Sequence, residues 1–237
     1  MNAYGFLEDH IPWVVQASLL AAALIFAAGL AVRRQIAAAN GGVLPDQGVT
    51  LRNALEVVVE GLSGLARDTM GEEWRRYFPV VGTIFVFILI SNLMGLVPGL
   101  RGATSDINTT AAWAIISFGV YNYVGFRTHG RWYVNQFLGP SFFEAHIFGR
   151  HVHVRLLAPF FFILEVPLHF ARILTLTVRL LANMYADHMV VGVWLGLVPI
   201  AIPAIFMGLG LMVAALQAFV FSLLTMIYIG LALEEAH

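Results

Sequence analysis

The sequence contains several apolar runs long enough to cross a lipid bilayer, and short polar connections separate them. About 20 consecutive apolar residues span the hydrocarbon core of a membrane as an α-helix. Runs of about this length or longer occupy residues 11–32, 78–97, 109–126, 156–197 and 204–233. Because backbone groups inside a bilayer must be hydrogen-bonded within their own segment, these runs predict helices. We therefore expect an all-α integral membrane protein with five transmembrane helices.

The composition supports this fold class and excludes several kinds of chemistry. Of the 237 residues, 59% are hydrophobic and 11% are charged, whereas soluble domains have about 25% charged residues. No polar stretch is long enough for a second folded domain, so residues 1–237 are predicted to form a single membrane domain. The chain has no cysteine, which excludes disulfides and iron–sulfur ligation. A net charge of −1 gives no indication of nucleic-acid binding.

Residues 50–70 differ from the apolar runs because charged residues recur among the apolar ones: Arg52, Glu56, Glu60, Arg67 and Asp68. This mixture predicts an amphipathic helix on the membrane surface. The arginines also predict an orientation. With the N-terminus outside, every arginine that lies beyond the apolar runs, except Arg101, falls on the cytoplasmic side. The excess of cationic residues in cytoplasmic loops favours this orientation, which places the C-terminus in the cytoplasm.

In the run 156–197, residues Glu165, His169, Arg172, Leu176, Arg179, Asn183 and Asp187 follow one another at steps of three and four, and all of them except Leu176 are polar. Such spacing keeps them on one helix face, about 80° wide. A charge at the bilayer centre costs about 3 kcal/mol, so this face is expected to meet polar surroundings. Along the helix axis, Arg179 lies about 21 Å from Glu165 and about 12 Å from Asp187. Its counter-ion is therefore expected from another helix or another subunit.

The run 204–233 has one main polar residue at mid-depth, Gln217, and Gly210 and Tyr228 lie on the same helix face. A buried amide needs hydrogen-bond partners, which makes Gln217 the informative residue of this helix.

The strings "RLLANMYADH" and "LQAFVFSLLTMIYIGLALEEAH", together with "SNLMGLVPG" and "SDINTT", resemble the a subunit family of the rotary F-type ATP synthase membrane sector. The family's arginine and the asparagine four residues later match Arg179 and Asn183. Its glutamine on the following helix matches Gln217, and its acidic residue fourteen positions before the arginine matches Glu165. The resemblance covers Tyr77 to His237.

The resemblance implies a proton-translocating stator subunit without ATP chemistry of its own, in the cell inner membrane. The last two helices would form a long tilted hairpin packed against a ring of c subunits. The arginine would hold each passing ring carboxylate deprotonated and separate two offset half-channels. The other implied partners are the subunit b peripheral stalk, the remaining synthase subunits and lipid. No cofactor, metal or nucleic acid is implied.

Within that resemblance, Glu165 belongs to the cytoplasmic side, and Asp187 and His188 belong to the outer half-channel. Many bacterial members have Glu where this chain has His188 and His where it has Gly210. Because histidine titrates near neutral pH, His188 is a candidate proton relay. Arg172 stands where relatives often have lysine and is expected to anchor the cytoplasmic side. His169 and Tyr228 are supporting residues.

Two other functions fit an intramembrane charge. A haem-binding redox subunit would need two histidines at one depth, but His169 and His188 lie about 28 Å apart on one helix. His151 and His153 suggest a metal site, but a solvated loop without a third ligand is the simpler interpretation. A self-contained ion-coupled transporter is commonly built from internal repeats, and the sequence shows none.

Overall fold

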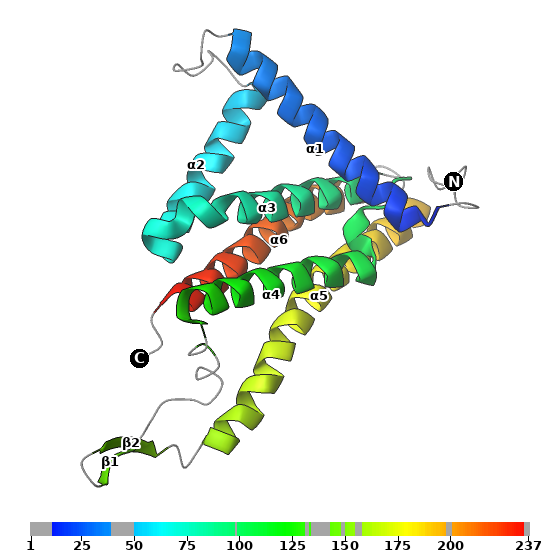
Figure 1. Cartoon of the computed structure of the whole chain (residues 1–237). Helices are drawn as coiled ribbons and strands as arrows, with labels where there is room; N and C mark the ends of the chain where they lie inside the picture. The colour runs from blue at the N-terminus through cyan, green and yellow to red at the C-terminus, as the bar shows by residue number, and fades with distance from the viewer. Residues whose placement is uncertain are drawn as a thin grey trace.

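The computed structural model describes residues 11–38, 50–97, 99–130, 133, 143–147, 150–154, 158–197 and 201–234. Figure 1 shows how the elements are arranged. The six α-helices are α1 Trp13–Ala38, α2 Leu51–Met70, α3 Trp74–Leu96, α4 Ile107–His129, α5 Ala158–Leu197 and α6 Ala201–Leu233. The 3-10 helix η1 Gly71–Glu73 precedes α3, the 3-10 helix η2 Ala103–Ser105 precedes α4, and the strands β1 Phe143–Ile147 and β2 Arg150–Val154 lie between α4 and α5. The described chain is helical apart from one antiparallel pair of short strands, β1 and β2.

That strand pair lies within the connection 127–155, which was expected to be an exposed polar segment, whereas the long apolar elements are all helices. Phe143–Ile147 and His151–Val154 alternate apolar and polar residues, and alternation with a period of two is the pattern of a strand. The helix ends also differ from the apolar runs. The first helix continues past Arg33 and Arg34 to Ala38, and α3 begins at Trp74, four residues before the run 78–97.

Four helical stretches are long and apolar enough to cross a membrane: Trp13–Ala37, Arg52–Leu96, Pro167–Leu197 and Ile202–Leu233. The second of these includes α2, η1 and α3. By the same criterion α4 falls short, since it carries polar residues such as Asn108, Ser117 and Asn122. A crossing by α4 and a surface position for α2 therefore stay predictions.

The core lies where α3, α4, α5 and α6 pack together. Its fully buried side chains include Val81 and Ile88 of α3, Val124 of α4, Leu180 of α5 and Ile229 of α6. The amphipathic helix α2 adds a buried stripe at steps of four: Leu62, Ala66 and Met70. Figure 1 shows α2 crossing α3 at a steep angle, at the end of the bundle where α6 finishes. This arrangement is typical of a helix that covers one end of a bundle.

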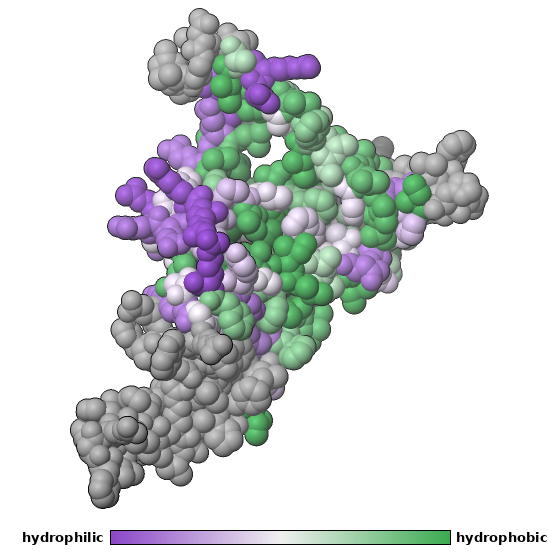
Figure 2. All heavy atoms as spheres, in the orientation of Figure 1, coloured by the Kyte–Doolittle hydropathy of each residue, from purple (hydrophilic) through white to green (hydrophobic). Residues whose placement is uncertain are grey.

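The surface of the bundle is mostly apolar between two polar regions. Figure 2 shows hydrophobic residues over the middle of the molecule and hydrophilic ones gathered at the edge near the start of α3. On α5, the large apolar side chains of Leu168, Phe170, Leu174 and Val178 are exposed. Exposed apolar side chains on this scale need lipid or a partner to cover them.

The connection between α3 and α4 folds back onto the bundle. Ala103 and Thr104 are fully buried. The Thr104 hydroxyl donates to Asn92 Oδ1 over 2.7 Å, and Asn92 Nδ2 donates to the Ala214 carbonyl over 3.3 Å. Satisfied buried hydrogen bonds of this kind fix one arrangement. They join η2 to α3 and α6, and they hold Ser105 at the end of the bundle.

Candidate functional site

The polar stripe on α5 lies one residue away from the middle of the buried face. The centre of that face is apolar, with Leu176, Leu180 and Met184 each at most 3% exposed. Arg179 and Asn183 are half-buried at its rim. Hydrophobic packing therefore takes the middle of the interface, and the polar residues lie between the packed face and the open face of α5.

Among the residues that the structure describes, Arg179 stands at this rim without a counter-ion. No hydrogen bond or ion pair joins its guanidinium to another group in the part of the chain that the structure describes. The residues beside it on the open face are small, since Thr175, Ala182 and Ala186 are exposed there. Small side chains at a membrane helix surface allow another helix to approach closely. The guanidinium is thus accessible from outside the chain.

Two contacts show which residues of α6 lie at the same depth as which residues of α5. The Arg172 guanidinium lies 5.0 Å from the centre of the Tyr228 ring. Near the other end, the Asp187 carboxylate lies against Gly210. With equal rises along both helices, Arg179 is level with about residue 220, within about one turn of Gln217. Gln217 is also half-buried, and neither it nor Asn183 bonds to a described residue. Arg179, Asn183 and Gln217 therefore occupy the same depth of the hairpin.

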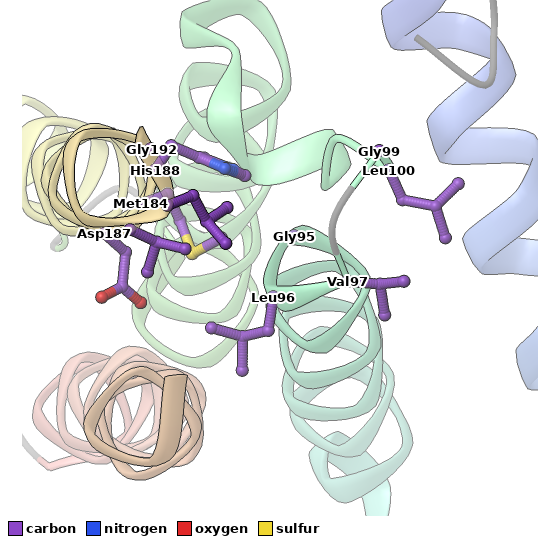
Figure 3. Close-up of a pocket in the computed structure, with 11 residues that line it drawn as sticks. Gly95, Leu96, Val97, Gly99, Leu100, Met184, Asp187, His188 and Gly192 are labelled. Carbon is purple, nitrogen blue, oxygen red and sulfur yellow. The ribbon is translucent and has the colours of Figure 1, made fainter. Parts of the chain in front are cut away.

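A cavity of about 190 Å³ lies beyond this level, towards the end of α5. The loop after α3 and one face of α5 form its walls, and Figure 3 shows Asp187, His188, Met184 and Gly95 around it. Asp187 and His188 leave α5 in different directions. The carboxylate reaches α6 at Gly210, and the ring reaches η2 at Ser105. The cavity is large enough for water and has a carboxylate and an imidazole in its wall.

Gly210 makes room for the Asp187 carboxylate. A Cβ built at Gly210 would lie 2.5 Å from Asp187 Oδ2 and 2.6 Å from Leu96 Cδ2. Contacts this close require one of these groups to move. The carboxylate of Asp187 therefore occupies the space that a side chain at position 210 would otherwise fill.

A second polar group lies at the opposite end of α5. The ring of Tyr121 is 5.7 Å from that of Tyr228 and 6.1 Å from that of His169, and Arg172 lies over Tyr228. Ser117 and Thr225 share a buried hydrogen bond of 2.8 Å close by. The structure thus brings the predicted supporting residues His169, Arg172 and Tyr228 together.

Apolar packing separates the two polar regions. Between them the interface of α5 and α6 contains Leu176 and Leu180 with Ala214, Ala218 and Phe221, all buried. The hydroxyls in this part, of Thr177 and Ser222, donate to carbonyls of their own helices over 2.8 and 2.9 Å. In the described part of the hairpin, the middle of the α5–α6 interface between the two regions is therefore apolar, and the polar residues Arg179, Asn183 and Gln217 at this depth are half-buried.

For some other predicted residues the structure describes the helix or strand but not the side chain. Glu165 lies in α5, but its side chain is outside the described residues, as are those of His151 and His153 in β2. Among the side chains that are described, no group of three His, Cys, Asp or Glu lies close enough to hold a metal ion.

Three residues that the structure places near the predicted site residues were not predicted from the sequence: Ser105, Gly95 and Tyr121. Ser105 and Gly95 contact His188, and Tyr121 joins the group around Tyr228. The strings "SNLMGLVPG" and "SDINTT" contain Gly95 and Ser105, so the resemblance marked the segments. Nothing in the sequence indicated that they meet α5.

Comparisons with known proteins show the family of this chain. The family model described as the ATP synthase A chain matches residues 15–230. The chain is 38% identical to an ATP synthase subunit a of Citrifermentans bemidjiense over 237 residues, which cover all of this chain and 94% of the relative. It is 39% identical to ATP synthase subunit a 1 of Syntrophotalea carbinolica, over 100% of this chain and 90% of that one. It is also 45% identical to ATP synthase subunit a 1 of Pelobacter propionicus, over 79% and 76% of the two chains. The chain therefore belongs to the ATP synthase A chain family, the proton-translocating subunit of the synthase membrane sector.

Proposed function

We propose that this chain carries protons to and from a ring of partner subunits through two half-channels that do not meet. The cavity beside Asp187 and His188 is the outer half-channel. The group around His169, Arg172 and Tyr228 lies on the inner one, with Glu165. Arg179 stands between them, about 12 Å from Asp187 and about 10 Å from Arg172 along α5.

The observation that carries this proposal is a half-buried arginine for which the described residues offer no counter-ion, placed between two polar regions with buried apolar side chains between them. A guanidinium stays protonated at any working pH, so it can repel protons without taking one up. An unpaired charge in a membrane is costly, so a counter-ion is expected. A carboxylate on a passing subunit would be that counter-ion, and it would lose its proton beside the arginine.

The partners follow from the surfaces that the hairpin leaves open. The small residues beside Arg179 leave room for a ring helix, and the exposed apolar side chains of α5 need a cover. A proton that reaches the ring from Asp187 and His188 would leave it on the other side of Arg179. A direct leak would waste about 2.3 kcal/mol per proton at 100 mV, and the apolar packing around Leu180 opposes such a leak.

We propose further that the chain lies in the cell inner membrane with the N-terminus outside and the C-terminus in the cytoplasm. It would have five crossings, with α2 on the cytoplasmic surface. The peripheral stalk of subunit b is its expected static partner. All ATP chemistry would belong to other subunits.

The deciding experiment replaces Arg179 in the assembled synthase and measures ATP-driven proton pumping in sealed vesicles. Arg179→Ala should reduce pumping to background, since nothing else in the described hairpin offers a permanent positive charge at this depth. Arg179→Lys keeps a charge but should restore only a small fraction, because a desolvated lysine can lose its proton.

The matched control is Arg34→Ala, which removes an exposed arginine at the end of α1. It should pump at the rate of the unchanged complex. ATP hydrolysis by the same preparations reports assembly, so that rates are compared at equal amounts of complex. Pumping at the unchanged rate in Arg179→Ala would refute the proposed function.

A further inference from the structure

Ser105, at the end of η2, contacts His188 of α5 although 83 positions separate them in the sequence. Ser105 Oγ lies 3.0 Å from His188 Nε2, which is hydrogen-bond distance. Ser105 is half-buried, and so is His188, which lines the outer cavity. Figure 3 shows the His188 ring directed away from Asp187, towards the segment that connects α3 to α4.

Gly95 limits the ring from the side of α3. A Cβ built there would lie 3.3 Å from His188 Nε2 and 2.5 Å from Met184 Cε. The ring edge therefore rests close to bare backbone, and a larger residue at 95 would push against Met184 and crowd the ring. Gly95 of α3 and Ser105 of η2 thus lie near the same ring nitrogen of His188.

Ser105 itself is well fixed. The preceding residue, Thr104, is fully buried and donates to Asn92. The following residue, Asp106, begins α4 and accepts a hydrogen bond from the Asn108 backbone over 2.8 Å. A capping bond of this type stabilises the start of a helix. The hydroxyl is therefore placed by the fold on both sides and is not carried on a free loop.

A serine hydroxyl suits a histidine that changes its protonation state. It can donate to Nε2 when that nitrogen is bare, and it can accept when Nε2 carries a proton. The second ring nitrogen, Nδ1, is left for exchange with other groups, and while it gains or loses a proton Nε2 keeps its own hydrogen and donates it to Ser105. The charged neighbours of His188 are Asp187 on its own helix and Arg101 from the loop before η2. The ionised carboxylate of Asp187 can only accept, and the guanidinium of Arg101 can only donate.

We propose that Ser105 is a positioning residue of the outer half-channel, which holds the His188 ring by Nε2 in both protonation states while a proton passes. This inference rests on the proposed function, because it assumes that His188 exchanges protons. It assigns a role in proton transfer to the connection between α3 and α4.

The test uses the assembled synthase in vesicles and measures the rate of ATP-driven pumping against pH. Ser105→Ala should slow pumping about three- to tenfold, the range that one neutral hydrogen bond supports, and should shift the pH profile. Ser105→Thr keeps the hydroxyl and should pump within about twofold of the unchanged complex. Ser105→Val has nearly the same shape as threonine without the hydroxyl, and it should behave like alanine.

The control for a generic loss of a serine is Ser18→Ala on α1, whose hydroxyl donates to the Val14 carbonyl of its own helix over 2.8 Å. It should leave rate and pH profile unchanged. The decisive comparison is made in the His188→Ala background, where Ser105→Ala should have no further effect.

Two results would overturn the inference. The first is an unchanged rate and pH profile in both Ser105→Ala and Ser105→Val. The second is an equal loss from Ser105→Ala with and without His188, which would show a purely structural role. Either result can occur while Arg179→Ala still abolishes pumping, so the proposed function and this inference fail separately.

Discussion

At the scale of single residues, the position of Arg179 relative to the buried face matters more than its depth. Had the arginine stood at the position of Leu180, it would be enclosed by its own chain, and no passing partner could reach it. Arg179 is instead half-buried next to the buried Leu180, and the small residues Ala182 and Ala186 on the open side of the helix are exposed. A shift of one residue around the helix thus separates a structural ion from one that can bind a moving partner.

Gly210 gives the first residue-scale prediction. Gly210→Ala places a Cβ 2.5 Å from Asp187 Oδ2 and 2.6 Å from Leu96 Cδ2. Both atoms are at the ends of side chains and can move, so the complex should still assemble. The carboxylate must leave its place against α6, so proton pumping should fall several-fold. The measurement is ATP-driven pumping at equal amounts of assembled synthase.

The matched control is Gly208→Ala, two residues away on the same helix, where an added Cβ meets no other atom within 4 Å. It should pump normally. Equal rates in the two variants would mean that the place of the Asp187 carboxylate does not matter for proton transfer.

At the scale of elements, the connection between α3 and α4 is a wall of the site and not a passive link. Its closest approach to α3 is at Gly102, where a Cβ would collide with the backbone carbonyl of Ser91 and lie 3.2 Å from the Gly95 nitrogen. Backbone atoms cannot move aside as a side chain can. Only glycine allows η2 to lie this close to α3.

Gly102→Ala should therefore destabilise the protein by about 1–3 kcal/mol, the usual penalty of overpacking. The loss should appear as a lower thermal midpoint of the purified complex in detergent. Gly119→Ala, in open space on α4, should be neutral or slightly stabilising, since alanine is the better helix former. Equal midpoints for Gly102→Ala and the unchanged protein would mean that η2 does not pack on α3 as described.

The sequence predicted the helices better than the contacts between them. Apolar runs and a mixed segment sufficed for α2 and the long helices, because length and periodicity are local properties. The strand pair was missed because the polar residues of 143–154 suggested a solvated connection. Steps of three and four found Arg179 and Asp187. Ser105, however, meets His188 only because Gly102 and Thr104 fold the loop back, and no local pattern contains that fold.

At the scale of the whole molecule, two groups of contacts show which helix ends lie together at each end of the bundle. At one end, Arg101 lies 5.5 Å from the centre of the Trp13 ring of α1, and Ser105 meets His188. At the other end, His129 Nε2 lies 3.1 Å from the Ala232 carbonyl, at the end of α6. Thus the start of α1 and the start of α4 share one end, while the finish of α4 and the finish of α6 share the opposite one.

This sorting makes α4 the helix on which the orientation can be tested. Its 23 residues span about 34 Å, enough for a hydrocarbon core of about 30 Å, although its composition alone does not mark it as a crossing.

The chain has no cysteine, so single cysteines at exposed Asn108 and exposed Thr128 report the two ends of α4 without background labelling. A membrane-impermeant maleimide added to spheroplasts (cells stripped of their outer layers) should label Asn108→Cys, and it should label Thr128→Cys only after the membrane is opened. The cationic residues Arg127 and His129 beside Thr128 favour the cytoplasm. Labelling of both cysteines from one side would show that α4 does not cross, and the reversed pattern would place the cavity of Asp187 and His188 on the cytoplasmic face.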